Sequence, residues 1–117
     1  MFKLAESTTV YLSLQATDMR CGCDRLSRAV EEQFSRNALD GGLYVFLSRD
    51  RKKVKILKWD NDGYWLHYKR LEASTFRVKR SETTEEITGV DLGKLLSGMD
   101  LSRIKLCKKV KDNLTKT

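Results

Sequence analysis

The sequence predicts a single α+β domain, in which an antiparallel β-meander packs against one long amphipathic helix and a short helical segment follows. Three observations predict this class. Short runs of β-branched and aromatic residues occur, turn-forming residues join them, and one stretch repeats apolar residues at helical spacing. A chain of 117 residues fits one domain. We expect that domain to span residues 1–100, with a basic tail at 101–117.

The first expected elements are a strand and a helix. Thr9–Leu14 is rich in β-branched and aromatic side chains, which is typical of a strand. Thr17-Asp18 can cap a helix that runs to about Arg36, and Gly41-Gly42 then turns the chain. Apolar residues recur along one face of this helix at spacings of three and four: Met19, Cys23, Leu26, Val30 and Phe34.

Three strands with short connections are expected next, at Leu43–Ser48, Lys53–Trp59 and Tyr64–Leu71. Asp60–Gly63 between two aromatic strands indicates a hairpin, in which Gly63 would take the positive φ that such turns require. Consecutive tight hairpins make an antiparallel meander. Alternation then divides the side chains between two faces. The face expected against the helix carries Val54, Ile56, Leu66 and Tyr68.

The last part of the chain has weaker patterns. Phe76–Arg80 is compatible with a further strand, and polar Ser81–Glu86 is expected to be a loop. A short helix is expected from Asp91, as its cap, to Gly98.

The net charge of +7 is concentrated in one part of the chain. Residues 1–48 have a net charge of −1 and residues 81–117 of +1, whereas residues 49–80 hold eleven basic and four acidic residues. Such a local excess attracts polyanions, although it is also found on solvated surfaces without a partner. The longest apolar run, Leu43–Leu47, is too short to span a bilayer, and no signal peptide is evident. We therefore expect a cytoplasmic protein.

The motifs of common enzymes and cofactor sites are missing from the sequence. Gly41-Gly42 is not followed by the Lys-Ser/Thr pair of a phosphate-binding loop, and His67 has no acidic neighbour to orient it. Asp60 and Asp62 could bind a metal ion, but their spacing is more typical of turn formation. Cys21, Cys23 and Cys107 match no zinc spacing and are expected to be reduced thiols. We predict no catalytic residue, metal, cofactor or small-molecule substrate.

The basic residues of the segment 49–80 are expected to lie along a two-stranded ribbon, which we call the basic ribbon, and this feature suggests a function. A two-stranded ribbon can enter the major groove of DNA or follow its phosphates. Aromatic residues interleave with its charges and would suit base stacking, cross-strand packing or a protein interface, for which Trp59, Tyr64 and Trp65 are the candidates. The candidate nucleic-acid-binding residues are Arg49, Arg51, Lys52, Lys53, Lys55, Lys58, Lys69 and Arg70.

Separate motifs between Thr9 and Phe76 resemble one known family. They are Thr17–Gly22 with Asp24 and Leu26, Leu43–Phe46, Val54–Leu66, and Tyr68–Glu72 with Phe76. In this order and spacing they resemble the TnpB-type, second-reading-frame accessory protein of the IS-sixty-six group of bacterial insertion sequences. The chain departs from that pattern at Cys21 and in having no proline.

The resemblance implies a bacterial mobile-element protein that acts beside a separate transposase, and it supplies no catalytic residues. We therefore predict a non-catalytic accessory protein that supports transposition by binding DNA, at the element ends, through the basic hairpin. The alternative is a protein adaptor that docks on the transposase without touching DNA.

Overall fold

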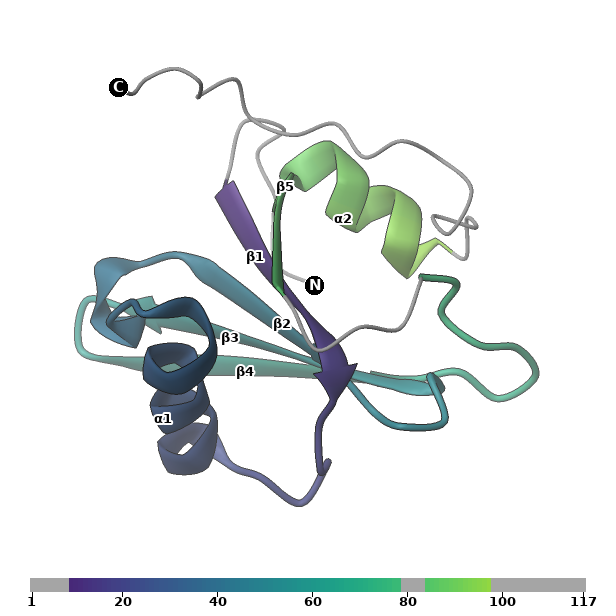
Figure 1. The fold of residues 1–117 in the computed structure, drawn as a ribbon, viewed down its shortest axis with the longest axis horizontal. Helices are drawn as coiled ribbons and strands as arrows, with labels where there is room; N and C mark the ends of the chain where they lie inside the picture. Colours follow the sequence, from purple (N-terminus) through teal and green to yellow (C-terminus); the bar gives the residue numbers. More distant parts are fainter. Residues whose placement is uncertain (1–8, 79–83, 98–117) are drawn as a thin grey trace.

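The computed structural model describes residues 9–78 and 84–97. A five-stranded sheet carries two short helices, which pack on opposite faces of it (Figure 1). The elements, in chain order, are β1 (Thr9–Ala16), α1 (Cys23–Phe34), a 3₁₀ turn η1 (Ala38–Asp40), β2 (Leu43–Leu47), β3 (Lys53–Asp60), β4 (Gly63–Arg70), β5 (Thr84–Thr88) and α2 (Gly89–Leu96).

The sheet is mixed, so the prediction of an antiparallel meander under one long helix is wrong, although the class is still α+β. The strand order is β4-β3-β2-β1-β5, and β1 runs parallel to β2 while the other neighbours are antiparallel. The physical reason is the connection. The chain leaves β1 and returns through α1, and a crossover of this kind is what parallel neighbours require.

The part of the sheet formed by β2, β3 and β4 is the meander that the local pattern predicts. Its β3–β4 hairpin pairs Trp59 with Tyr64 and Asp60 with Gly63. The residue with positive φ in this turn is Asn61, at 62°, and not Gly63 as predicted. Asn tolerates the left-handed region because its short polar side chain can satisfy nearby backbone groups, and Gly63 is free to start β4.

The helix α1 is shorter than predicted. It begins after Gly22 and ends at Ser35, whose φ of 55° lies in the left-handed region. Asp18 does not cap it. Its carboxylate instead accepts hydrogen bonds from the backbone N–H and the guanidinium of Arg20, at 2.9 and 2.7 Å, which keeps residues 17–22 in a loop.

Each face of the sheet has its own buried cluster. On the α1 side, Leu26 and Val30 of the helix pack on Tyr44, Phe46 and Leu57. On the α2 side, the helix residues Leu92 and Leu95 and the loop residue Phe76 belong to a second cluster. Its strand residues are Val10, Leu12, Leu14, Leu43, Val45, Leu47, Val54, Ile56 and Ile87.

The predicted choice of face is therefore wrong. Val54 and Ile56 lie on the α2 side, whereas Leu66 packs on the α1 side, because the ladder pairs Leu66 with Leu57. Directly paired residues point to the same face of a sheet. The predicted set mixed two faces because it assumed a register one residue out of step.

The C-terminal predictions need three corrections. Residues 76–78 are not a strand, and Phe76 is a buried core residue instead. Residues expected in a loop form β5, which pairs with β1 and places Ile87 beside Val10. The helix α2 is capped by Thr88, whose hydroxyl accepts from the backbone N–H of Asp91, so Asp91 lies inside the first turn. The predicted tail 101–117 lies outside the described residues.

Candidate nucleic-acid interface

The basic residues predicted to bind nucleic acid do not share one surface. The β3–β4 ladder pairs Lys53 with Arg70 and Lys55 with Tyr68, on the side of α1. Lys58 and Lys69 belong to the alternate set and point to the α2 side, because successive strand residues face opposite ways. The structure thus divides the basic ribbon between two faces.

Arg51 is part of the protein interior. Only 8% of its surface is exposed, and its Nη2 donates to the carbonyl oxygen of Leu14, 3.2 Å away. Its φ of 61° turns the backbone there into the left-handed region. This side chain ties the β2–β3 turn to β1 and is not presented to a partner.

Two of the lysines also hold backbone carbonyls. Lys55 Nζ donates to the carbonyl oxygens of Met19 and Cys21, at 2.9 and 2.8 Å, and so fixes the loop before α1. Lys69 Nζ donates to the carbonyl oxygen of Leu96 at the end of α2, at 3.1 Å. Both ammonium groups complement the partial negative charge of carbonyl oxygens.

Four of the predicted cations lie where β3 begins and β4 ends, together with Arg77, which was not among the predicted site residues. Backbone hydrogen bonds fasten the segment after β4 to the β2–β3 turn, because the N–H groups of Leu71 and Phe76 donate to the carbonyl oxygens of Lys52 and Arg51, at 2.7 and 2.6 Å. We call this region the basic end. Its cations are Arg49, Lys52, Lys53, Arg70 and Arg77, all exposed except the half-buried Lys53.

Asp50 organises the turn at the basic end. Its carboxylate accepts from the Ser48 hydroxyl at 2.6 Å and from the Lys52 backbone N–H at 3.0 Å. These hydrogen bonds, with the ammonium of Lys53 3.4 Å away, lower the pKa of Asp50 to about 2. Glu72 accepts from Arg70 Nε at 3.0 Å. The basic end nevertheless keeps more cations than carboxylates.

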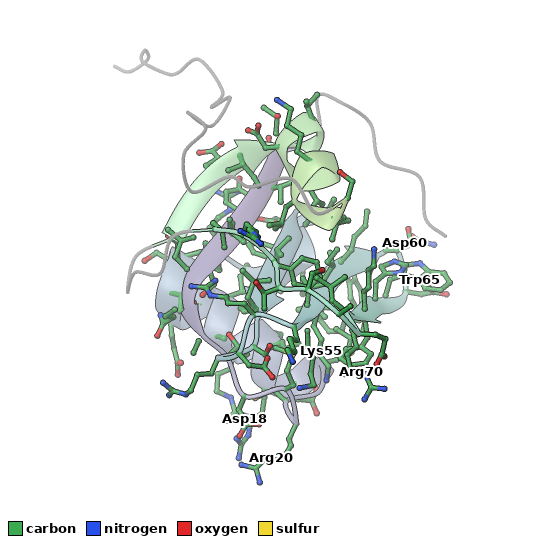
Figure 2. The ribbon with its side chains drawn as sticks, turned by 90° about the vertical axis from the view of Figure 1, so that its right-hand side faces the viewer. Asp18, Arg20, Lys55, Asp60, Trp65 and Arg70 are labelled. Carbon is green, nitrogen blue, oxygen red and sulfur yellow. The ribbon has the colours of Figure 1, made fainter. Side chains whose placement is uncertain are left out.

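The three aromatic residues predicted at a protein interface are also divided. Trp59 and Tyr64 contact edge to face on the α1 side, with ring centroids 5.0 Å apart. Trp65 lies on the other side, stacks on His67 with centroids 6.0 Å apart, and is 56% exposed. Its indole N–H donates to Asp60 Oδ2 at 3.0 Å, and the two side chains project outward together (Figure 2).

The described residues contain no cluster of three or more metal-ligating side chains. Asp60 acts as the acceptor for Trp65, and Asp62 is an exposed turn residue. Cys21 and Cys23 are free thiols, while Cys107 lies outside the described residues.

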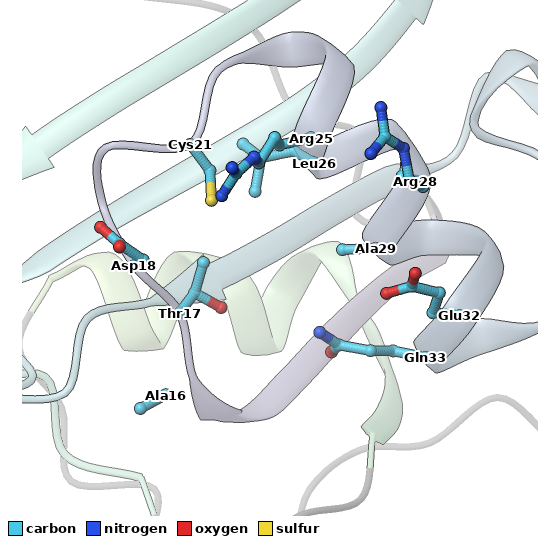
Figure 3. A pocket seen from close by; sticks show the side chains of 10 residues that line it. All are labelled: Ala16, Thr17, Asp18, Cys21, Arg25, Leu26, Arg28, Ala29, Glu32 and Gln33. Atoms are coloured by element: carbon cyan, nitrogen blue, oxygen red, sulfur yellow. The ribbon is translucent and has the colours of Figure 1, made fainter.

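One surface feature was not predicted, a hollow of about 350 Å³ between the loop after β1 and α1 (Figure 3). Its wall mixes charges of both signs, with Asp18 and Glu32 opposite in sign to Arg25 and Arg28. The helical spacing of residues 25, 28, 29 and 32 marks one face of α1, but nothing local indicates that the loop lies across it. None of the predicted site residues lines this hollow.

No helix in the described ranges 9–78 and 84–97 is long and apolar enough to cross a membrane. The profile of the family described as "IS66 Orf2 like protein" matches residues 8–106. A relative from Sinorhizobium fredii, named "Uncharacterized protein y4hO", is 35% identical over 101 residues, which cover 86% of this chain and 88% of the relative. No solved structure matches. The chain therefore belongs to the IS66 Orf2-like family of insertion-sequence accessory proteins, as its motifs predict.

Proposed function

We propose that this accessory protein binds DNA of its insertion sequence through the basic end of the sheet. The observation that carries the proposal is the gathering of Arg49, Lys52 and Arg77, all exposed, on two segments joined by backbone hydrogen bonds. Lys53 and Arg70 complete the group. The family is generally non-catalytic and is associated with the transposition machinery of the element.

This proposal uses fewer residues than the sequence predicted. Arg51, Lys55 and Lys69 donate to carbonyl oxygens of the protein itself, so they stabilise the fold that carries the basic end. Lys58 lies on β3 away from it. We expect these exposed Arg and Lys side chains to contact phosphates, because phosphate contacts supply most of the affinity of basic surfaces for DNA.

The test is a salt titration of duplex binding by the full chain, measured by fluorescence anisotropy. The triple variant Arg49→Ala/Lys52→Ala/Arg77→Ala should bind more weakly and lose about 2–3 from the slope of log K against log salt, at about 0.9 per phosphate contact. The matched control removes three exposed charges elsewhere, Arg20→Ala/Arg25→Ala/Arg28→Ala. An equal loss in both variants, or none in the first, would contradict the proposal.

A second candidate is a protein adaptor that docks on the transposase of the same element. The observation that favours it is the exposure of Trp65, because exposed tryptophan is enriched at the centres of protein interfaces. Co-purification with the transposase in high salt should then survive the triple variant at the basic end and be lost with Trp65→Ala. The reverse pattern would favour DNA as the link between the two proteins.

A further inference from the structure

The strand β4 forms one edge of the sheet, and in the described part of the chain no strand pairs with its outer side. It has eight residues, Gly63–Arg70, and carries two large hydrophobic side chains in the open: Trp65 is 56% and Tyr68 is 53% exposed. A long edge with exposed aromatic residues is a template for another strand, unless charges or irregular backbone protect it.

We propose that β4 pairs with β4 of a second copy of this chain, antiparallel about a two-fold axis at Leu66, so that the two sheets join into one. An interface of this type is self-complementary, since the same strand supplies both sides. The β4 edge shares Arg70 with the basic end, but the proposal rests on strand pairing and does not depend on DNA binding.

The faces of the sheet restrict the register of this pairing. Residues on the α1 side must lie opposite residues on the α1 side, so the strand can shift only in steps of two. With Leu66 opposite Leu66, Tyr64 lies opposite Tyr68 on one face, and Trp65 lies opposite His67 on the other. Both exposed aromatic residues thereby gain an aromatic partner, and such cross-strand pairs stabilise antiparallel ladders.

The charges at the two ends of β4 favour the same register. The exposed carboxylate of Asp62 precedes the strand, and Arg70, with 58% of its side chain exposed, ends it. In the proposed pairing each Asp62 lies opposite the second copy's Arg70, and this occurs twice by symmetry. A shift of two residues one way would place Asp62 opposite Tyr68, and the other way opposite Glu72, which repels it.

Arg70 can serve this pair without losing its own neighbour. Glu72 accepts from the Nε atom of Arg70, and a guanidinium carries further N–H groups on its terminal nitrogens. One strand pair buries a modest area, so we expect a weak dimer with a dissociation constant of about 1–100 μM.

Sedimentation equilibrium of the full chain without DNA tests the proposal. The native chain should dimerise with rising concentration. Asp62→Arg and Arg70→Asp should each raise the dissociation constant about tenfold or more, because each places like charges opposite one another. The double variant Asp62→Arg/Arg70→Asp exchanges the two charges and should return the constant to within about threefold of the native value, given the energies of such pairs. Both residues are exposed, and circular dichroism of each variant verifies the fold.

A charge reversal away from the edge, Arg25→Asp, is the matched control and should leave the dissociation constant unchanged. The proposal is overturned if the native chain remains monomeric at about 500 μM, well above the expected range. It is also overturned if neither single variant weakens the dimer, or if the double variant is as weak as the singles. If β4 instead docks a different protein, the native chain alone should remain monomeric.

Discussion

The guanidinium of Arg51 donates to the carbonyl oxygen of Leu14 at 3.2 Å, across a separation of 37 residues in sequence. The contact joins the β2–β3 turn to β1, and both residues are buried. A residue that the sequence assigns to a basic patch is thus a structural cross-link.

Removing this cross-link should destabilise the fold. We expect Arg51→Ala to lower the free energy of unfolding by about 2–3 kcal/mol, because a buried hydrogen bond from a charged group is lost and the Leu14 carbonyl is left unsatisfied. The neighbouring Lys52→Ala, an exposed side chain, should change it by about 0.5 kcal/mol or less. Urea denaturation measures both. Similar values for the two variants would contradict the structural role of Arg51.

Lys55 should behave differently from Lys58, although both lie on β3. The Lys55→Met variant loses two hydrogen bonds to the loop before α1 and should cost about 1–3 kcal/mol, with faster hydrogen exchange at the backbone of residues 17–22. Lys58→Met is the control on the opposite face and should leave exchange in that loop unchanged. If the two variants exchange alike, the loop is not held by Lys55.

Acid should weaken the fold partly through Asp40. Burial opposes ionisation of this carboxyl, but hydrogen bonds from the Gly42 backbone, Tyr44 and Arg36 outweigh it and lower the pKa of Asp40. A carboxyl with a lowered pKa in the folded state stabilises that state above its unfolded pKa of about 3.9, and this contribution disappears as the pH falls through the folded pKa.

The Asp40→Asn variant tests this link. It should be less stable than the native chain at neutral pH, and its stability should fall less steeply below about pH 4, since the titrating group is absent. Urea denaturation between pH 2.5 and 7 provides the curves. Parallel curves for the two proteins would show that Asp40 is not responsible for the acid sensitivity.

Two glycines should respond in opposite directions to alanine. A Cβ atom at Gly42 would lie 3.0 Å from the Tyr11 ring and 3.1 Å from Asp40 Oδ1, so Gly42→Ala should cost about 1–3 kcal/mol through overpacking. At Gly93, on α2, a Cβ meets nothing within 4 Å, and Gly93→Ala should stabilise the protein by about 0.5–1 kcal/mol through helix propensity. Thermal unfolding of both variants checks the contrast, and the same sign for both would contradict it.

The meander of β2, β3 and β4 follows from the sequence because its signals are local. Alternating residues such as Val54 and Ile56, and a turn at Asp60–Gly63, act within a few positions. The parallel pairing of β1 with β2 depends on the path of α1 and has no local signal. The strand β5 is predicted as a loop because it is polar, as is typical of an edge strand. Within Thr84–Thr88, Ile87 belongs to the buried core.

The sequence predicts where the positive charge of the candidate site is concentrated along the chain, but not which of its side chains share a surface. Composition locates the excess in residues 49–80, yet alternation along β3 sends Lys53 and Lys58 to opposite faces. The inward turn of Arg51 depends on a carbonyl of β1, and the register that separates Trp65 from Trp59 depends on the hairpin. The alternation is local and can be read from the sequence, whereas the inward turn of Arg51 is a tertiary relation that the pattern of residue types does not contain.

The position of β1 has a consequence for how the chain reaches its native state. This strand comes first in the described chain, yet it lies between β2 and β5, and Val10 is matched with both Leu43 and Ile87. Its pairing must await segments that are synthesised much later, and such distant partners raise contact order and slow folding, to about milliseconds to seconds. A nascent chain that has emerged only as far as β4 still has an incomplete sheet, with β1 as a second open edge, and depends on the residues from Thr84 onward to close it.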